Sequence, residues 1–203
     1  KTINLEKLPD HILNNSKIEH RIKAIFNTTP QNVMINELIL KNKVLELKIT
    51  AKDNENLDLL KQSLNKIYQT VETKKLDEKQ ESNFEAIVVA KDELEIKDVV
   101  YGIFTQEYLQ DELFDKESIN EQLKILLPEH SIIKYIETLN ANKVEIFSFS
   151  VNTIVKEPKD LFNIFTNINS ELYSITISKP ILMKNTNLGI EVDFIIEFNQ
   201  LKN

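Results

Sequence analysis

The sequence contains one short motif twice, and the spacing of its two copies constrains the fold more than any other feature. Residues 42–50 read NKVLELKIT and residues 142–150 read NKVEIFSFS, so the copies lie 100 residues apart. Each copy follows a β-rich segment that comes after a proline (Pro30 and Pro128), and each precedes a helical segment and two more alternating apolar segments. A repeat of this kind indicates a duplicated α/β unit.

Both units have the same predicted order of elements: helix, strand, strand, helix, strand, strand. Leu57, Leu60 and Leu64 recur at the three- and four-residue spacing of one helix face. The predicted strands span residues 33–40, 43–50, 71–76, 84–90, 132–139, 143–151, 173–181 and 190–198. Apolar and polar residues alternate most clearly at residues 45–50 and 190–198, which is typical of a sheet with one buried face. The predicted fold class is α+β, with two tandem ferredoxin-like domains in a permuted αββαββ order, each a four-stranded antiparallel sheet with two helices on one face.

Local signals refine this prediction. Pro9 and the polar residues 14–16 predict a break in the N-terminal helical segment, because proline interrupts the helical hydrogen bonds. Asp53 or Asn54 is expected to cap the following helix, and Pro158 is expected at the start of a helix. Glu145 stands where the first copy has a leucine, which predicts a bulge or a change of face there. The core of the second unit is predicted to contain the following apolar residues: Phe147, Phe149, Phe165, Phe194 and Ile196.

We predict a first domain at residues 1–92, which includes an N-terminal helical segment, and a second domain at residues 115–203. Residues 93–114 are interpreted as a linker and docking segment. Three aromatic residues in it, Tyr101, Phe104 and Tyr108, lie next to the acidic residues Glu107, Asp111 and Glu112. Two readings stay open for these side chains: an amphipathic surface that docks a partner, or packing between the two domains.

Composition excludes several classes of function. The formal net charge is −7, and residues 101–203 carry 15 Asp/Glu against 9 Lys/Arg. A nucleic-acid binder needs a concentrated basic face, so we expect no nucleic-acid partner. The chain has no cysteine and only two glycines, which excludes a thiolate site and a glycine-rich phosphate loop. Its three histidines do not have the spacing of a helical metal site. We therefore expect no catalytic residue, no metal and no cofactor.

Residues 30–38 (PQNVMINEL) and 43–51 (KVLELKITA), together with the helix at 57–68 and the Phe-led strand FEAIV at 84–88, resemble the periplasmic domain of the PilN family. Residues 127–198 are similar to PilN and to its partner family PilO. The resemblance rests on the order of a proline-led strand, a hairpin and a helix. This chain lacks the glycine that the family often has after the second strand and has Thr50 and Ala51 there.

The resemblance implies a non-catalytic assembly or scaffold subunit of a type IV pilus, type II secretion or DNA-uptake inner-membrane platform. It implies a periplasmic location, with self-association or association with homologous platform subunits. It also implies a membrane anchor in a segment that would precede Lys1, the sole contact with the membrane that we expect. The alternative function is a small-ligand-binding regulatory module. An enzyme is the third reading, for which the sequence offers no constellation of residues.

The interface is predicted on the third strand of the second unit, at Tyr173, Ser174, Ile175, Thr176 and Ile177. This stretch has no charged residue, whereas edge strands of monomeric proteins are usually protected by charge or proline. An exposed edge of this kind can accept a partner strand. The competing interpretation is that the strand is internal to the sheet and already paired on both sides.

Overall fold

The computed structural model describes residues 10–92, 114–141, 144–171 and 175–201. The described residues form four helices: α1 (Asp10–Thr28), α2 (Asn54–Leu64), α3 (Lys116–Leu126) and α4 (Pro158–Glu171). The strands of the first half are β1 (Val33–Leu40), β2 (Val44–Ala51), β3 (Thr70–Lys75) and β4 (Phe84–Lys91). Those of the second half are β5 (Ile132–Ala141), β6 (Val144–Val155), β7 (Ile175–Thr186) and β8 (Gly189–Leu201). The predicted order of elements is confirmed in both halves.

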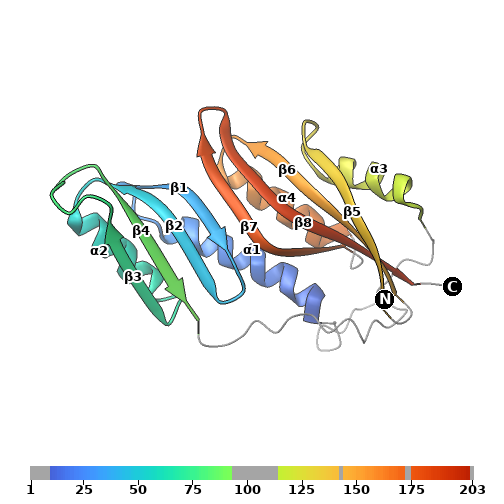
Figure 1. Cartoon of the computed structure of the whole chain (residues 1–203), viewed down its shortest axis with the longest axis horizontal. Helices are drawn as coiled ribbons and strands as arrows, with labels where there is room; N and C mark the ends of the chain where they lie inside the picture. The colour runs from blue at the N-terminus through green and yellow to red at the C-terminus, as the bar shows by residue number, and fades with distance from the viewer. Residues whose placement is uncertain (1–9, 93–113, 142–143, 172–174, 202–203) are drawn as a thin grey trace.

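All eight strands form one antiparallel sheet with the order β3-β4-β2-β1-β7-β8-β6-β5. The four helices lie on one face of this sheet, and no helix of the described residues lies on the other, helix-free face (Figure 1). The protein is therefore a mixed α+β fold built on a large antiparallel sheet. Within each half the strands follow the same spatial order: third, fourth, second, first.

The duplication extends to an irregularity in the backbone. The pairing of β1 with β2 shifts register between Ile35 and Glu37, and the pairing of β5 with β6 shifts between Tyr135 and Glu137. The two shifts lie 100 residues apart, as the sequence motifs do. A β-bulge adds one residue to one strand and changes which face the following side chains occupy. The first strands of the two halves, β1 and β5, therefore have the same irregularity at the same position.

The two halves meet at a seam between β1 and β7. Residues Glu37–Leu40 of β1 pair with Ile181–Lys184 of β7. Beneath the seam α1 packs on α4: Phe26 and Phe162 meet edge to face with ring centroids 6.0 Å apart. The Thr166 hydroxyl also donates a hydrogen bond of 2.7 Å to Glu19 Oε1. The sheet, the helix layer and the apolar core thus continue from one half into the other.

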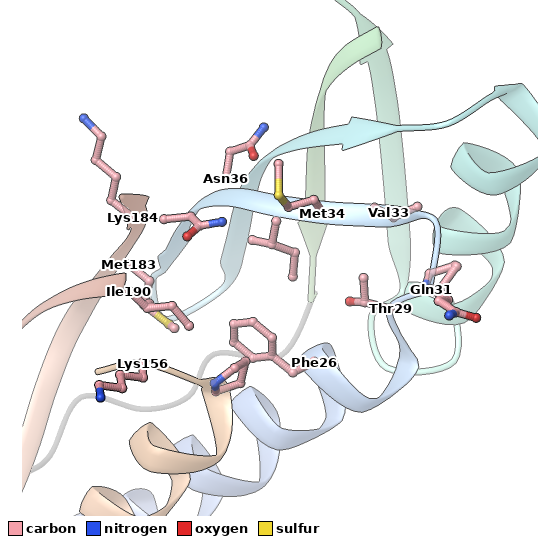
Figure 2. Close-up of a pocket in the computed structure, with 14 residues that line it drawn as sticks. Phe26, Thr29, Gln31, Val33, Met34, Asn36, Lys156, Met183, Lys184 and Ile190 are labelled. Carbon is pink, nitrogen blue, oxygen red and sulfur yellow. The ribbon is translucent and has the colours of Figure 1, made fainter. Parts of the chain in front are cut away.

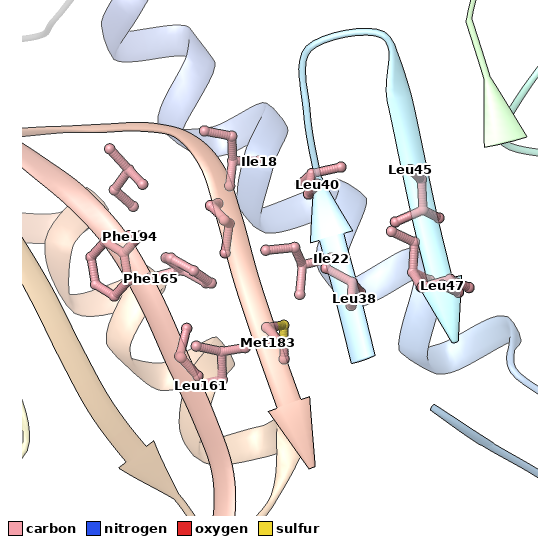
Figure 3. Packing of buried hydrophobic residues seen from close by; sticks show 14 of the residues in the cluster. Ile18, Ile22, Leu38, Leu40, Leu45, Leu47, Leu161, Phe165, Met183 and Phe194 are labelled. Atoms are coloured by element: carbon pink, nitrogen blue, oxygen red, sulfur yellow. The ribbon is translucent and has the colours of Figure 1, made fainter. Parts of the chain in front are cut away.

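The core lies between the sheet and the helices (Figure 3). The predicted core residues of the second half are confirmed as buried, and the ring centroids of Phe165 and Phe194 lie 5.9 Å apart. At the seam, Leu38 and Leu40 of β1 and Met183 of β7 are buried together with Ile22 of α1. Helix α1 thus covers the line where the two halves join.

Two local predictions are wrong. Helix α1 is continuous through residues 14–16, because Ile18, Ile22 and Ile25 anchor one face of it in the core and tertiary packing overrides the weak helix propensity of the asparagines. Strand β6 has no bulge at Glu145, since its pairing with β8 is continuous. The Glu145 carboxylate instead accepts a hydrogen bond of 3.1 Å from Gln200 Nε2.

The predicted starts of α2 and α4 agree with the structure, and α3 has a cap that was not predicted. Asp53 caps α2, accepting a hydrogen bond of 2.9 Å from the Asn56 backbone N–H, and Asp115 caps α3 in the same way from Ser118 at 2.8 Å. These hydrogen bonds stabilise the charged carboxylates and lower the pKa of both Asp53 and Asp115. Pro158 is the first residue of α4. Each half therefore contains one helix whose start is fixed by an aspartate.

Candidate functional site

The sheet ends in two outer strands, β3 and β5, and they differ in length and composition. β5 pairs with β6 on one side and, within the described part of the chain, with no strand on the other. It is ten residues long. Four of its large apolar side chains are between 42% and 53% exposed: Ile132, Tyr135, Ile136 and Leu139. The strand also carries the exposed charges Lys134 and Glu137, but its length and its exposed apolar side chains make this edge a template for another strand.

The opposite edge is protected. β3 has six residues and reads TVETKK, with the exposed charged residues Glu72 and Lys74. Its next residue, Lys75, places its ammonium group 4.2 Å from the centroid of the Phe84 ring. Charged side chains, lysine above all, discourage edge-to-edge pairing. β3 is therefore the weaker candidate for binding a strand.

The predicted interface strand lies inside the sheet. β7 stands between β8 and β1, and its Ile175, Thr176 and Ile177 side chains are buried in this structure. Its pairing with β1 covers Ile181–Lys184, so the internal alternative describes that part of β7, and residues 175–178 pair with β8. The association of residues 175–177 with a partner protein stays a prediction.

The other predicted interface residues lie outside the described residues: Tyr173, Ser174, Tyr101, Phe104 and Tyr108. Of the predicted linker, Phe114 alone is described. Its ring meets Phe198 edge to face at 6.0 Å, and its backbone N–H and C=O both hydrogen-bond the Gln200 side-chain amide. This end of the linker is thereby held against β8.

Sequence reasoning missed β5 as the open edge. The signal was present, because residues 132–139 read IIKYIETL and place large apolar side chains on both faces of a strand. A strand with one wet face alternates instead. The charges at Lys134 and Glu137 concealed this difference.

A pocket of about 500 Å³ opens at the seam, where β1 and β7 diverge before their pairing begins (Figure 2). Phe26, Met183 and Ile190 line its apolar side. Its polar lining residues, none of which is buried, are Thr29, Gln31, Asn36, Lys156, Lys184 and Asn185. A ligand site usually has a few polar groups that converge on the ligand from an enclosed wall. This pocket has no buried polar group of that kind.

One charged cluster fastens α1 to the first half. Arg21 Nη1 lies 3.0 Å from Asp92 Oδ2, and the guanidinium stands 4.4 Å from the centroid of the Tyr68 ring. Burial raises the pKa of the Tyr68 hydroxyl, and the charge of Arg21 partly opposes that rise. The three side chains come from α1, from the segment after α2 and from the residue that follows β4. Their arrangement explains how α1 is held and offers no reactive pair.

The carboxylates of Glu191 and Asp193 share one hydrogen-bond donor. Asn152 Nδ2 donates to both, at 2.9 Å to Glu191 and 2.8 Å to Asp193.

His130 is exposed, and its ring nitrogen lies 2.8 Å from the Ile154 carbonyl oxygen. Among the described residues, no group of three or more His, Asp or Glu side chains is placed to hold a metal.

None of the helices in the described ranges has the length and apolar composition that crossing a membrane requires. Comparison of the chain with family models, with curated proteins and with solved structures finds no match.

Proposed function

We propose that the protein is a non-catalytic assembly subunit that works by edge-to-edge association of β-sheets. The observation that carries this proposal is the open β5 edge, with its four exposed apolar side chains. The same kind of pairing already exists at the seam. There β1, the strand equivalent to β5, pairs with β7 on the side that is the outer side of β5. The open seam pocket, which lacks convergent buried polar groups, favours this role over a small-ligand module.

The proposal also covers the fold of each half and the cellular location of the protein. Moving the first strand of a βαββαβ ferredoxin-like unit to its end gives the strand order third, fourth, second, first, which is the order in each half. This supports two permuted ferredoxin-like units. Together with the sequence resemblance to PilN and PilO, it supports a periplasmic place in the inner-membrane platform of a pilus, secretion or DNA-uptake machine.

The test is recovery of platform subunits from detergent-solubilised membranes of the source cell with the tagged chain. We expect PilN-like or PilO-like subunits to be recovered by the wild type and lost with Ile136→Lys, which places a charge on the open edge. Ile87→Lys is the matched control, because Ile87 on β4 is 40% exposed and Ile136 is 46% exposed. Recovery of no platform subunit by the wild type would contradict the proposal.

A further inference from the structure

We infer that the β5 edge pairs with the β5 edge of a second copy of this chain, antiparallel across a two-fold axis. The inference rests on the proposed function: in the isolated chain a second copy occupies the β5 edge, and in the assembly a platform subunit replaces that copy at the same edge. Pairing two copies in this way joins two eight-stranded sheets into one. A two-fold interface uses the same patch on both subunits, so the patch must be complementary to itself.

The first step is to find which β5 side chains share a face. Ile132, Lys134, Glu137 and Leu139 pair with alternate residues of β6, namely Asn152, Ser150, Ser148 and Ile146. Alternate residues of a strand point to one face. The four β5 side chains therefore share the helix-free face, which they do because the bulge adds one residue between Lys134 and Glu137.

The second step is the register. In antiparallel strands, residues directly opposite one another must point to the same face. A regular strand cannot place residue 134 opposite residue 137 of its own copy, since residues three apart point to opposite faces. The bulge removes that obstacle. With Lys134 opposite Glu137, the two-fold axis makes this pair twice, and Ile132 meets Leu139 twice.

The third step compares the self-paired edge with the alternative partner, the β3 edge of another copy. At the seam, β1 pairs with Ile181–Lys184, a segment that β7 has beyond the register shift in its pairing with β8. β3 has no such extension, because it ends at Lys75 and its last two residues are lysines. The head-to-tail join that forms the seam therefore does not repeat between chains, and the self-complementary β5 pairing remains.

The experiment measures the mass of the purified 203-residue chain by sedimentation equilibrium over a range of concentrations. We expect a dimer for the wild type. Lys134→Glu and Glu137→Lys should each weaken the dimer at least tenfold, because like charges then oppose one another at both pairs. An equimolar mixture of the two variants should form a mixed dimer, in which every Lys again opposes a Glu. The double variant Lys134→Glu/Glu137→Lys should dimerise as the wild type does.

Glu72→Lys, an exposed charge reversal on the β3 edge, is the matched control and should leave the dimer unchanged. Thermal melting of each variant verifies that it folds. A monomeric wild type at every concentration would overturn the inference, as would a dimer that neither single variant weakens or a mixture that stays monomeric. A chain that dimerises through β5 but recovers no platform subunit would refute the proposed function alone. A monomer that recovers those subunits would refute this inference alone.

Discussion

The β3–β4 hairpin of the first half and the β7–β8 hairpin of the second occupy equivalent places but have different lengths. β3 has six residues and β7 has twelve, and β7 continues past an irregularity between Ser178 and Leu182. The added length supplies the residues that pair with β1. The two halves thus form a single sheet because one of two equivalent hairpins is longer, and the strand order is the same in both halves.

The largest expected effect tests whether the two halves unfold together. Phe84 lies opposite Ala51 and Phe194 lies opposite Val151, so the two buried rings occupy equivalent places 110 residues apart. Phe84→Ala and Phe194→Ala should each lower the free energy of unfolding by about 3–5 kcal/mol. Because the core is continuous across the seam, either change should shift one common transition in calorimetry. A second transition at the wild-type temperature would show that the halves are independent.

A smaller effect is expected at the seam. Ile181 of β7 is fully buried opposite Leu40, and Ile181→Ala should lower the free energy of unfolding by about 2–4 kcal/mol, within the usual range for such a truncation. Leu182→Ala is the control, because Leu182 is 39% exposed on the same strand. Hydrogen exchange should become faster by a larger factor in residues 37–40, which line the seam, than in β3 and β4, which respond only through global unfolding. Unchanged protection of residues 37–40 would contradict a seam held by this side chain.

The smallest effect compares the two helix caps. Asp53→Ala and Asp115→Ala should each lower the melting temperature by about 2–4 °C, whereas Asp→Asn at either place should retain most of the cap. Folding lowers the pKa of both aspartates, so their contribution is present above pH 3.8 and is lost as the pH falls through the lower folded value. The difference in melting temperature between wild type and each Asp→Asn variant should therefore shrink below pH 3.8. A constant difference would show that the caps do not act through charge.

Much of the fold follows from periodicity, and the part that does not depends on contacts distant in the sequence. The element order and the buried face of β8 followed from alternating residues such as Val192 and Phe194. The seam did not, because nothing local in Glu37–Leu40 states that its partner lies more than 140 residues away. The exposed edge at β5 was not predicted, because the charge of each strand can be read from the sequence and its position in the sheet cannot.

The substitution of Glu145 for a buried leucine shows the same limit at one residue. Leu45 packs opposite Ala90, and at the equivalent place Glu145 stands opposite Gln200, which hydrogen-bonds it. Both members of the pair are apolar in the first half and both are polar in the second, so the strand register is the same in the two halves. A single residue viewed alone predicted a bulge, and the paired change across strands made one unnecessary.

The shortness of the seam has a mechanical consequence. β1 and β7 are joined by four residue pairs, whereas β6 and β8 are joined by twelve. A force that pulls the two outer edges of the sheet apart acts on every strand pair in series, and the pair with the fewest hydrogen bonds yields first. Under such a force the β1–β7 seam is therefore the place where the sheet separates first. Helix α1 packs across the seam, so the two halves cannot move far apart before α1 loses its contacts and the core beneath it is exposed.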